Sequence, residues 1–285
     1  MRQRSVVVTG VSTGIGAAVA RTLAARDVHV FGSVRKTGDA AALAAELGDR
    51  FTPLVFDVRD DDGVRAGAQT VREQLAGRTL FGLVNNAGIA LGGPLACQPL
   101  DEIRLMLEVN VVGALRVTQA LLPLLGAERG ARGAPGRIVN ISSVAGRIGG
   151  PFLGGYVASK HALEGMSESL RRELLLHGID VIVVAPGSVA TPIWDKAEGA
   201  DVARYDATPY AAALRAFREE FIRNGRRGYP PERVAAAVWT ALSARRPRTR
   251  YAVVPGRLMN WTIPMALPAR LVDRLLAARF GLRRA

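Results

Sequence analysis

Short apolar runs rich in β-branched residues alternate along this chain with longer segments whose apolar positions repeat at helical spacing. The runs predict strands at residues 5–9, 29–33, 52–56, 82–85, 137–141, 180–185 and 251–254. The longer segments predict helices at residues 15–26, 40–47, 61–76, 100–125, 156–177 and 231–243. Strands that alternate with helices indicate βαβ units. We therefore expect an α/β fold in a single domain, a doubly wound parallel sheet of the Rossmann type with helices on both faces.

Two segments interrupt this alternation. Residues 188–230 follow the sixth predicted strand, and ligands of open α/β sheets bind at the carboxyl ends of strands, so we expect a substrate lid there. Its aromatic residues suit an apolar ligand: Trp194, Tyr205, Tyr210, Phe217 and Phe221. Phe217 and Phe221 stand at helical spacing, however, and such aromatic residues are more often core than pocket. We expect residues 1–255 to form the dinucleotide-binding and catalytic domain, with 256–285 as a basic amphipathic C-terminal extension.

The C-terminal extension carries an apolar stripe at helical spacing, Leu271, Val272, Leu275, Leu276 and Phe280. Such a helix can pack on the protein itself or on a partner subunit, or lie on an anionic membrane surface. The remaining alternative is that the extension is a flexible tail exposed to solvent. The apolar run 263–267 is too short to span a bilayer. Its apolar side chains and those just before it could also line a substrate site: Met259, Trp261, Ile263, Met265 and Leu267.

The formal net charge of +13 suggests nucleic acid, but its distribution does not. Residues 245–285 hold ten arginines against one acid, Asp273, and so supply +9 of the total. We expect no nucleic-acid partner. The only cysteine is Cys97, so a reducing compartment is expected, and three scattered histidines predict no metal site. The apolar run after Ser5 is too short for a signal peptide, and we expect a cytoplasmic protein, with peripheral membrane contact through 258–285 left open.

A glycine-rich turn follows the first predicted strand. It reads Thr9-Gly-Val-Ser-Thr-Gly-Ile-Gly16 and opens the first predicted helix. Gly10, Gly14 and Gly16 allow a tight turn and let the backbone approach a pyrophosphate at the positive helix N-terminus. The strand–turn–helix context supports a dinucleotide site.

The end of the second predicted strand indicates which dinucleotide is preferred. A carboxylate there would bond the ribose 2′-hydroxyl of NAD, whereas an arginine accommodates the 2′-phosphate of NADP. This chain has Arg35 and Lys36 and no acid until Asp39. We therefore expect NADP(H), with NAD(H) as the less favoured cofactor and with hydroxyls of Ser12 or Thr13 assisting.

Tyr156 and Lys160 stand four residues apart within a predicted helix, so the phenol and the ammonium share one face. A nearby cation favours the ionised phenol and lowers its pKa from about 10. A tyrosine tuned in this way can transfer a proton near neutral pH. The spacing alone also fits a solvated pair.

Further motifs follow in order: Asp57-Val58 after the third strand, Asn85-Asn-Ala-Gly88, Asn110, Ser142-Ser143, the tyrosine–lysine pair, and Pro186-Gly187 with Thr191. Together with the glycine turn, T-G-x-x-x-G-I-G, they resemble the short-chain dehydrogenase/reductase family, particularly NADP(H)-dependent hydroxysteroid and retinol members. The resemblance covers residues 4–255.

The resemblance implies a hydride transfer between a nicotinamide and a carbonyl or carbinol carbon. Tyr156 would handle the proton, Lys160 would lower the tyrosine pKa and hold the nicotinamide ribose, and Ser143 would bond the substrate oxygen. Asn110 would bind a water that links Lys160 to solvent. The residues expected to bind the cofactor are Gly10, Ser12, Thr13, Gly14, Ile15, Gly16, Arg35, Lys36, Asp57, Val58, Asn86, Ala87, Gly88, Tyr156, Lys160, Pro186, Gly187, Val189 and Thr191.

The expected function is therefore an NADP(H)-dependent oxidoreductase acting on the CH–OH group of an apolar steroid-, retinoid- or lipid-like molecule. A 3-oxoacyl carrier-protein reductase and a non-catalytic NADPH-binding regulator are the alternatives. The family analogy also implies a homodimer or homotetramer that pairs through the two long helices.

Overall fold

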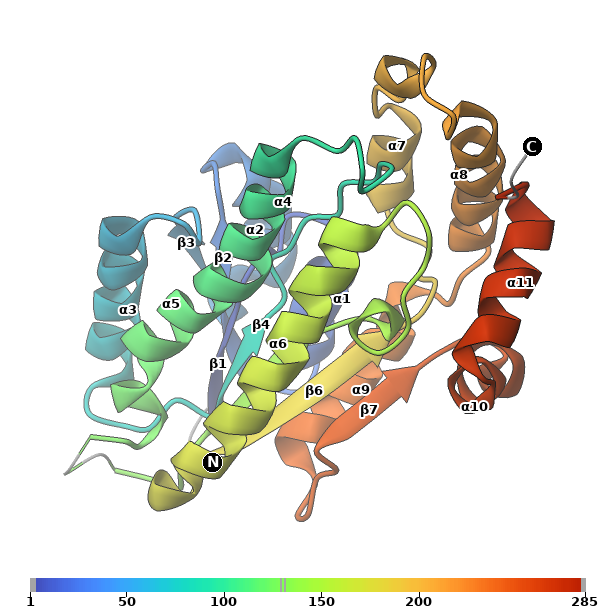
Figure 1. Ribbon diagram of the computed structural model, residues 1–285. Helices are drawn as coiled ribbons and strands as arrows, with labels where there is room; N and C mark the ends of the chain where they lie inside the picture. The colour runs from blue at the N-terminus through green and yellow to red at the C-terminus, as the bar shows by residue number, and fades with distance from the viewer. Residues whose placement is uncertain (1–3, 129, 131, 283–285) are drawn as a thin grey trace.

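A computed structural model describes residues 4–128, 130 and 132–282 and has a parallel sheet at its centre (Figure 1). The strand order is β3-β2-β1-β4-β5-β6-β7, and every neighbouring pair is parallel. The strands are β1 (Arg4–Val8), β2 (Val28–Val34), β3 (Phe51–Val55), β4 (Gly82–Asn85), β5 (Arg137–Ile141), β6 (Asp180–Pro186) and β7 (Arg250–Val253). The order reverses between β1 and β4, and ligands of this fold bind at that switch point.

Helices cover both faces of the sheet. The helices of the described residues are α1 (Gly14–Ala24), α2 (Gly38–Leu47), α3 (Asp61–Leu75), α4 (Leu100–Leu107), α5 (Gly113–Leu121), α6 (Gly154–Glu173), α7 (Ile193–Glu198), α8 (Ala211–Arg226), α9 (Pro231–Ser243), α10 (Ile263–Ala266) and α11 (Ala269–Phe280). Shorter π or 3₁₀ turns are η1 (Gly48–Arg50), η2 (Glu108–Val112), η3 (Pro123–Leu125), η4 (Val144–Gly146), η5 (Leu174–His177), η6 (Ala203–Tyr205) and η7 (Leu258–Thr262).

Alternate residues of each strand enter two different cores. In β1, Val6 and Val8 pack with α1, α2 and α9 on one face. Val7 packs with α3 and α5 on the other face. All three valines are fully buried. Burial on both faces is why the strands read as unbroken apolar runs, and the predicted fold class is confirmed.

One predicted helix is interrupted. The segment 100–125 consists of α4, the π-helical turn η2, α5 and η3. The π-helical turn contains Asn110, whose side chain accepts a hydrogen bond from the main-chain N–H of Ile89 and donates one to its carbonyl. This tertiary contact accompanies the change in helical pitch, which periodicity alone does not reveal. Single π-helical turns are frequent at functional sites.

The segment proposed as a lid contains two helices, α7 and α8, where the sequence predicted only a long connection. Its aromatic side chains pack on one another. The ring centroids of Trp194 and Phe221 lie 5.1 Å apart, and those of Phe217 and Phe221 lie 5.2 Å apart. Phe217 also contacts Phe152, in the loop before α6, at 5.6 Å. These rings form the core of the segment and tie it to the loop before α6.

The C-terminal extension packs on the protein at two anchors. Phe280 is buried against Phe217, and α11 lies beside α8 (Figure 1). Arg279 pairs with Glu220 at 2.6 Å. The second anchor is Trp261, which is also buried. The predicted apolar stripe is therefore only partly covered by the protein, because Phe280 is buried whereas Leu271 and Leu275 are exposed to solvent.

Among the described residues, no helix has the length and apolar character needed to cross a membrane. The terminal arginines Arg283 and Arg284, which the sequence analysis counted with the basic extension, lie outside the described residues.

Candidate active site

The glycine turn between β1 and α1 has the geometry that a bound pyrophosphate requires. Gly10 and Gly14 have φ angles of +71° and +60°, which side chains rarely adopt. A Cβ on Gly16 would collide with the carbonyl oxygen of Gly10 and lie 2.5 Å from Asn86 Nδ2. The first turn of α1 has no acidic residue and no side-chain cap, so its N–H groups remain available to an anion. The turn therefore fits a dinucleotide.

Thr9 joins this turn to the residues after β4. Its hydroxyl accepts hydrogen bonds from the main-chain N–H groups of Asn86, at 3.0 Å, and Ala87, at 2.9 Å. The Asn86 amide donates in return to the carbonyls of Thr9 and Gly10, at 2.9 and 3.0 Å. This network fixes the two loops on either side of the switch point. Thr9 was quoted in the motif but not singled out as a site residue.

The remaining predicted cofactor residues lie around the same edge of the sheet. Ser12 and Thr13 are exposed on the turn, and Ile15 packs against the core. Arg35 and Lys36 follow β2 and are exposed. The last group approaches the glycine turn from the end of β6 (Pro186, Gly187, Val189 and Thr191). Its contact with the turn is direct, because a Cβ on Gly14 would lie 3.3 Å from the Thr191 side chain.

Asp57 and Val58 occupy the end of β3 on the other side of the turn. Asp57 pairs with Arg59 at 2.8 Å, and this hydrogen-bonded guanidinium holds the pKa of Asp57 below its ordinary value. The nearby positive charge of Arg35 acts in the same direction. Val58 is buried and lies against Gly113 of α5, where an added Cβ would come within 2.7 Å of it.

The catalytic candidates converge beside the cofactor turn. Tyr156 and Lys160 lie on α6, and Lys160 Nζ is 5.8 Å from the centroid of the Tyr156 ring. Ser143, which precedes η4, forms a hydrogen bond with Tyr156. A Cβ on Gly88 would lie 3.1 Å from Asn110 Oδ1 and 3.7 Å from Lys160 Nζ. The structure therefore brings all four predicted catalytic residues to one edge of the sheet.

The pKa of Tyr156 departs from the expectation. Burial raises it, and the hydrogen bond with Ser143 opposes this only in part. Lys160 donates instead to the carbonyl of Ile141, at 2.9 Å. The pKa of Tyr156 is therefore raised where a lowered value was expected, because desolvation of the phenol favours its neutral form.

Two opposing effects act on the pKa of Lys160. Burial lowers its pKa from the ordinary value to about 8, while the carboxylate of Glu164 acts in the opposite direction. Only 6% of Lys160 is exposed. A lysine with this pKa changes charge close to physiological pH, so its surroundings decide how much of it is an ammonium.

Both N–H groups of the Asn110 amide are used within the protein. One donates to the carbonyl of Ile89 and the other to Ser159 Oγ, each at 2.9 Å. Ser159 in turn donates to the carbonyl of Tyr156 at 2.7 Å. Asn110 thus braces the helix that carries the catalytic pair, a link through Ser159 that the motifs did not indicate.

Ser142 is buried and its hydroxyl has no hydrogen-bond partner among the described residues, whereas its main-chain N–H donates to the carbonyl of Val184 at 2.8 Å. Asn85 donates to Thr118 and Asn140 at 3.0 and 2.9 Å and joins β4 to β5. Asn85 therefore links two neighbouring strands of the sheet through its side chain.

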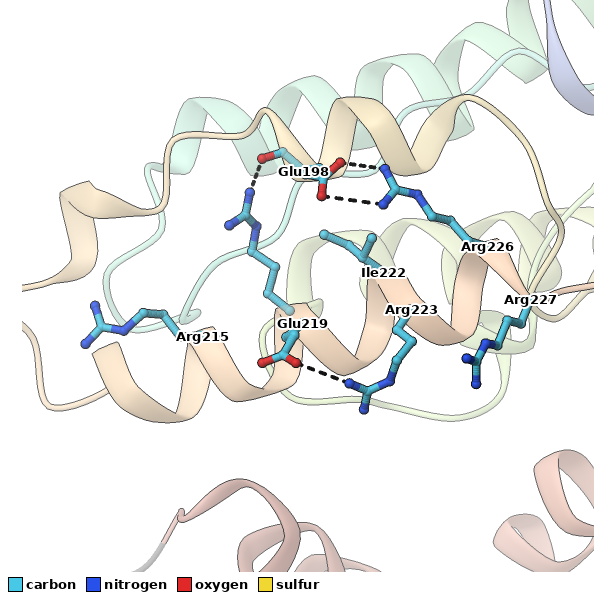
Figure 2. Close-up of a pocket in the computed structure, with 8 residues that line it drawn as sticks. Glu198, Arg215, Glu219, Ile222, Arg223, Arg226 and Arg227 are labelled. Atoms are coloured by element: carbon cyan, nitrogen blue, oxygen red, sulfur yellow. Dashed lines mark hydrogen bonds and ion pairs between the residues drawn. The ribbon is translucent and has the colours of Figure 1, made fainter.

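A surface groove lies between α7 and α8 and has a volume of about 580 Å³ (Figure 2). It is charged, and Arg226 at its end pairs with Glu198 at 2.5 Å and Asp195 at 3.0 Å. The lining residues are Glu198, Arg215, Arg218, Glu219, Ile222, Arg223, Arg226 and Arg227. The groove includes none of the catalytic candidates, and its charge does not suit an apolar substrate.

The fold and the site together define a class of protein, a nicotinamide-dinucleotide oxidoreductase with the nucleotide at the switch point of a doubly wound sheet. The sequence profile of the short chain dehydrogenase family matches residues 4–201. The chain belongs to the short-chain dehydrogenase/reductase family, which confirms the resemblance seen in the sequence.

Three relatives illustrate the similarity. The chain is 38% identical over 272 residues to the NADPH-dependent 3-dehydrocapnine reductase of Ornithobacterium rhinotracheale, covering 95% of each protein. It is 35% identical to retinol dehydrogenase 5 of Mus musculus, covering 95% of this chain and 87% of that protein. A short-chain dehydrogenase/reductase from Burkholderia phymatum, solved with NAD, matches 96% of this chain and 95% of its own at 25% identity and a TM-score of 0.78.

Proposed function

We propose that this protein transfers a hydride between NADP(H) and a carbonyl or alcohol group of a small apolar substrate. The proposal rests on the convergence of Ser143, Tyr156 and Lys160 beside a glycine turn that fits a dinucleotide. The test is NADPH oxidation with a panel of steroid, retinal, aliphatic, acyl-thioester and 3-dehydrocapnine carbonyls. Absence of oxidation across the whole panel, in protein that binds NADPH, would leave the non-catalytic regulator as the better description.

In this proposal each catalytic residue has a separate task. Ser143 donates a hydrogen bond to the substrate oxygen, where negative charge develops. Tyr156 moves a proton to or from the same oxygen. Lys160 contacts the nicotinamide ribose, and its positive charge favours the phenolate against the effect of burial. A water that exchanges this proton with solvent would donate to an oxygen of Asn110. When bound, NADPH supplies the hydride.

The substrate class is supported by the relatives, one named for 3-dehydrocapnine and one for retinol. The alternative of a 3-oxoacyl carrier-protein reductase is separated from it by the acyl-thioester members of the panel. By family analogy we also propose a homo-oligomer.

The preference for NADPH is proposed from Arg35 and Lys36, which are exposed at the end of β2 without a carboxylate beside them on that strand. A relative named as NADPH-dependent supports the preference, whereas a relative solved with NAD leaves the other cofactor as the competitor. Arg35→Ala is expected to raise the KM for NADPH about tenfold, which corresponds to the loss of one charge-assisted hydrogen bond. The KM for NADH should change little and provides the internal control. A wild-type KM for NADH well below that for NADPH would overturn the proposal.

Peripheral contact of the extension with an anionic membrane is proposed from its outer surface. Leu258, Met259 and Leu275 are 64%, 65% and 55% exposed. Arg270 and Arg274 are exposed nearby along the chain, and neither has a carboxylate partner in the part of the chain that the structure describes. Apolar side chains with unpaired arginines suit the surface of an anionic bilayer.

The replacement of Leu271 and Leu275 by serine is expected to reduce flotation of the protein with phosphatidylglycerol vesicles several-fold. Both residues are exposed, so the fold should be retained. Phosphatidylcholine vesicles serve as the control for charge. Equal flotation of the wild type and the double variant would exclude this surface as the contact.

A further inference from the structure

Helix α6 carries a second charged residue, Glu164, on the face of Tyr156 and Lys160. Glu164 stands four residues after Lys160, as Lys160 stands four after Tyr156, so the three side chains follow one another along α6. Glu164 is only 4% exposed. A buried carboxylate is costly unless it is paired and hydrogen-bonded, and the proposed chemistry assigns it no task.

Two arginines from distant segments bind the Glu164 carboxylate. Arg250, the first residue of β7, contacts both oxygens, with Nη2 at 3.0 Å from Oε1 and Nε at 3.1 Å from Oε2. Arg147, just after η4, approaches Oε2 at 3.3 Å. The bidentate contact with Arg250 fixes the position of the carboxylate and neutralises part of its charge.

The C-terminal extension completes this group. The guanidinium carbon of Arg250 lies 4.6 Å from the centroid of the Trp261 ring, and Trp261 is 9% exposed. The face of an indole attracts a guanidinium that lies over it. Trp261 belongs to η7, so the extension contacts the guanidinium that binds Glu164.

The loop that carries Ser143 lies against Glu164 as well. A Cβ on Gly146 would lie 2.7 Å from Ser142 Oγ and 2.9 Å from Glu164 Cγ. Glu164 therefore touches the loop after β5, while Arg250 ties it to the edge strand. Loop, helix, strand and extension all meet at this one carboxylate.

We propose that Glu164 is a positioning residue for Lys160, held in place by Arg250 and by Trp261 of the C-terminal extension. The proposal rests on the proposed function for the task of Lys160 itself. Its physical basis is that a fixed negative charge one helical turn away favours the ammonium form of a buried lysine. The C-terminal extension then contributes, through Trp261 and Arg250, to the charge that Glu164 presents to Lys160.

The groups that face these two residues can all be named. Lys160 is faced by Tyr156 and Glu164 of α6, by Asn110 of η2 and by the carbonyl of Ile141 in β5. Glu164 is faced by Arg147 and Arg250. The next carboxylate along the helix, Glu168, pairs with Arg147 and Arg172 at 3.0 and 3.6 Å and is half-exposed.

The chain offers a direct measurement, because Lys36, Lys160 and Lys196 are its only lysines. With lysine labelled at Cε by ¹³C, each ammonium can be titrated by NMR without any substrate, and Lys160→Arg assigns the signal. Glu164→Gln is expected to lower the midpoint of Lys160 by about half a unit to one unit, since the arginines already neutralise part of the carboxylate. Glu164→Asp should restore most of the difference. Glu173→Gln, at the exposed end of α6, is the matched control and should leave the midpoint unchanged.

Two more variants test the contribution of the extension. Arg250→Met should move the Lys160 midpoint upward, because it removes a cation that neutralises Glu164. Trp261→Ala should move it in the same direction by a smaller amount. Trp239, whose ring lies 5.5 Å from the guanidinium of Arg26, provides the control Trp239→Ala, which should have no effect.

The outcomes separate this proposal from the proposed function. An unchanged midpoint in Glu164→Gln overturns the role of Glu164, and an unchanged midpoint in Trp261→Ala overturns that of the extension. If Glu164→Gln alone does not fold, the double variant Glu164→Gln/Arg250→Met removes both charges. Its Lys160 midpoint should lie at lower pH than that of Arg250→Met. The titration does not depend on turnover, so an inactive wild type would contradict the proposed function only. In an active enzyme, the alkaline decline of kcat/KM should move to lower pH in Glu164→Gln.

Discussion

Tyr156→Phe is expected to reduce turnover by at least about 10²- to 10⁴-fold, the range that a positioned proton donor contributes. The phenylalanine ring fills the same space, but Ser143 loses its hydrogen-bond partner and the substrate oxygen loses its proton donor. The affinity for NADPH should change little, because the glycine turn that fits the pyrophosphate lies between β1 and α1 and not on α6. NADPH oxidation measures the first effect, and quenching of protein fluorescence by NADPH measures the second.

Tyr251→Phe is the matched control for this prediction. The Tyr251 hydroxyl accepts a hydrogen bond from the main-chain N–H of Arg248, at 3.0 Å, and its ring packs on the face of the sheet that α9 covers. Turnover should be retained in this variant. Near-normal turnover in Tyr156→Phe would contradict the assignment of the proton donor, whereas a parallel loss of NADPH binding would mean that the phenol is structural.

Gly16→Ala is expected to have the second large effect. The added methyl group would collide with the carbonyl oxygen of Gly10 and press on Asn86 Nδ2, both of which hold the turn together. The turn can accept the methyl group only by shifting its backbone, at a cost of about 1–3 kcal/mol. We expect a lower melting temperature and an NADPH dissociation constant raised at least about tenfold, since the shifted turn no longer fits the pyrophosphate.

Gly165→Ala provides the comparison. Gly165 lies within α6, and an added Cβ would meet no atom within 4 Å. Alanine in a helix interior is more favourable than glycine by about 0.5–1 kcal/mol, so this variant should be slightly more stable and bind NADPH normally. Unchanged melting and affinity in Gly16→Ala would show that the turn is more adaptable than its contacts indicate.

The centre of the sheet was predictable because its strands are apolar runs buried on both faces, as in Val6, Val7 and Val8. Strand boundaries in the structure differ from the predicted ones by at most a residue. The interruption at Asn110 was not predictable, because it accompanies hydrogen bonds to Ile89 and Ser159 that depend on the folded arrangement. The helices α7 and α8 were not predicted, although Phe217 and Phe221 stand at helical spacing, because the contacts that bury these rings, with each other and with Phe152, exist only in the folded chain.

The site residues could be named from their motifs, since each motif has a fixed place after a strand. The effect of the surroundings on the pKa of each site residue could not be predicted from these motifs. Spacing alone suggested that Lys160 would control Tyr156, but burial of the phenol is a property of the folded protein. Glu164 was visible one turn beyond Lys160, yet its partners Arg250 and Trp261 are distant in sequence and reach it only because β7 pairs with β6.

The place of β7 at the edge of the sheet has a consequence for synthesis on the ribosome. The turn at Gly10 and the residues after β4 precede Arg250 and Trp261 in the chain, so the ribosome makes them earlier. The charges around Glu164 and Lys160 can therefore reach their final arrangement only after the segments of the glycine turn have been made.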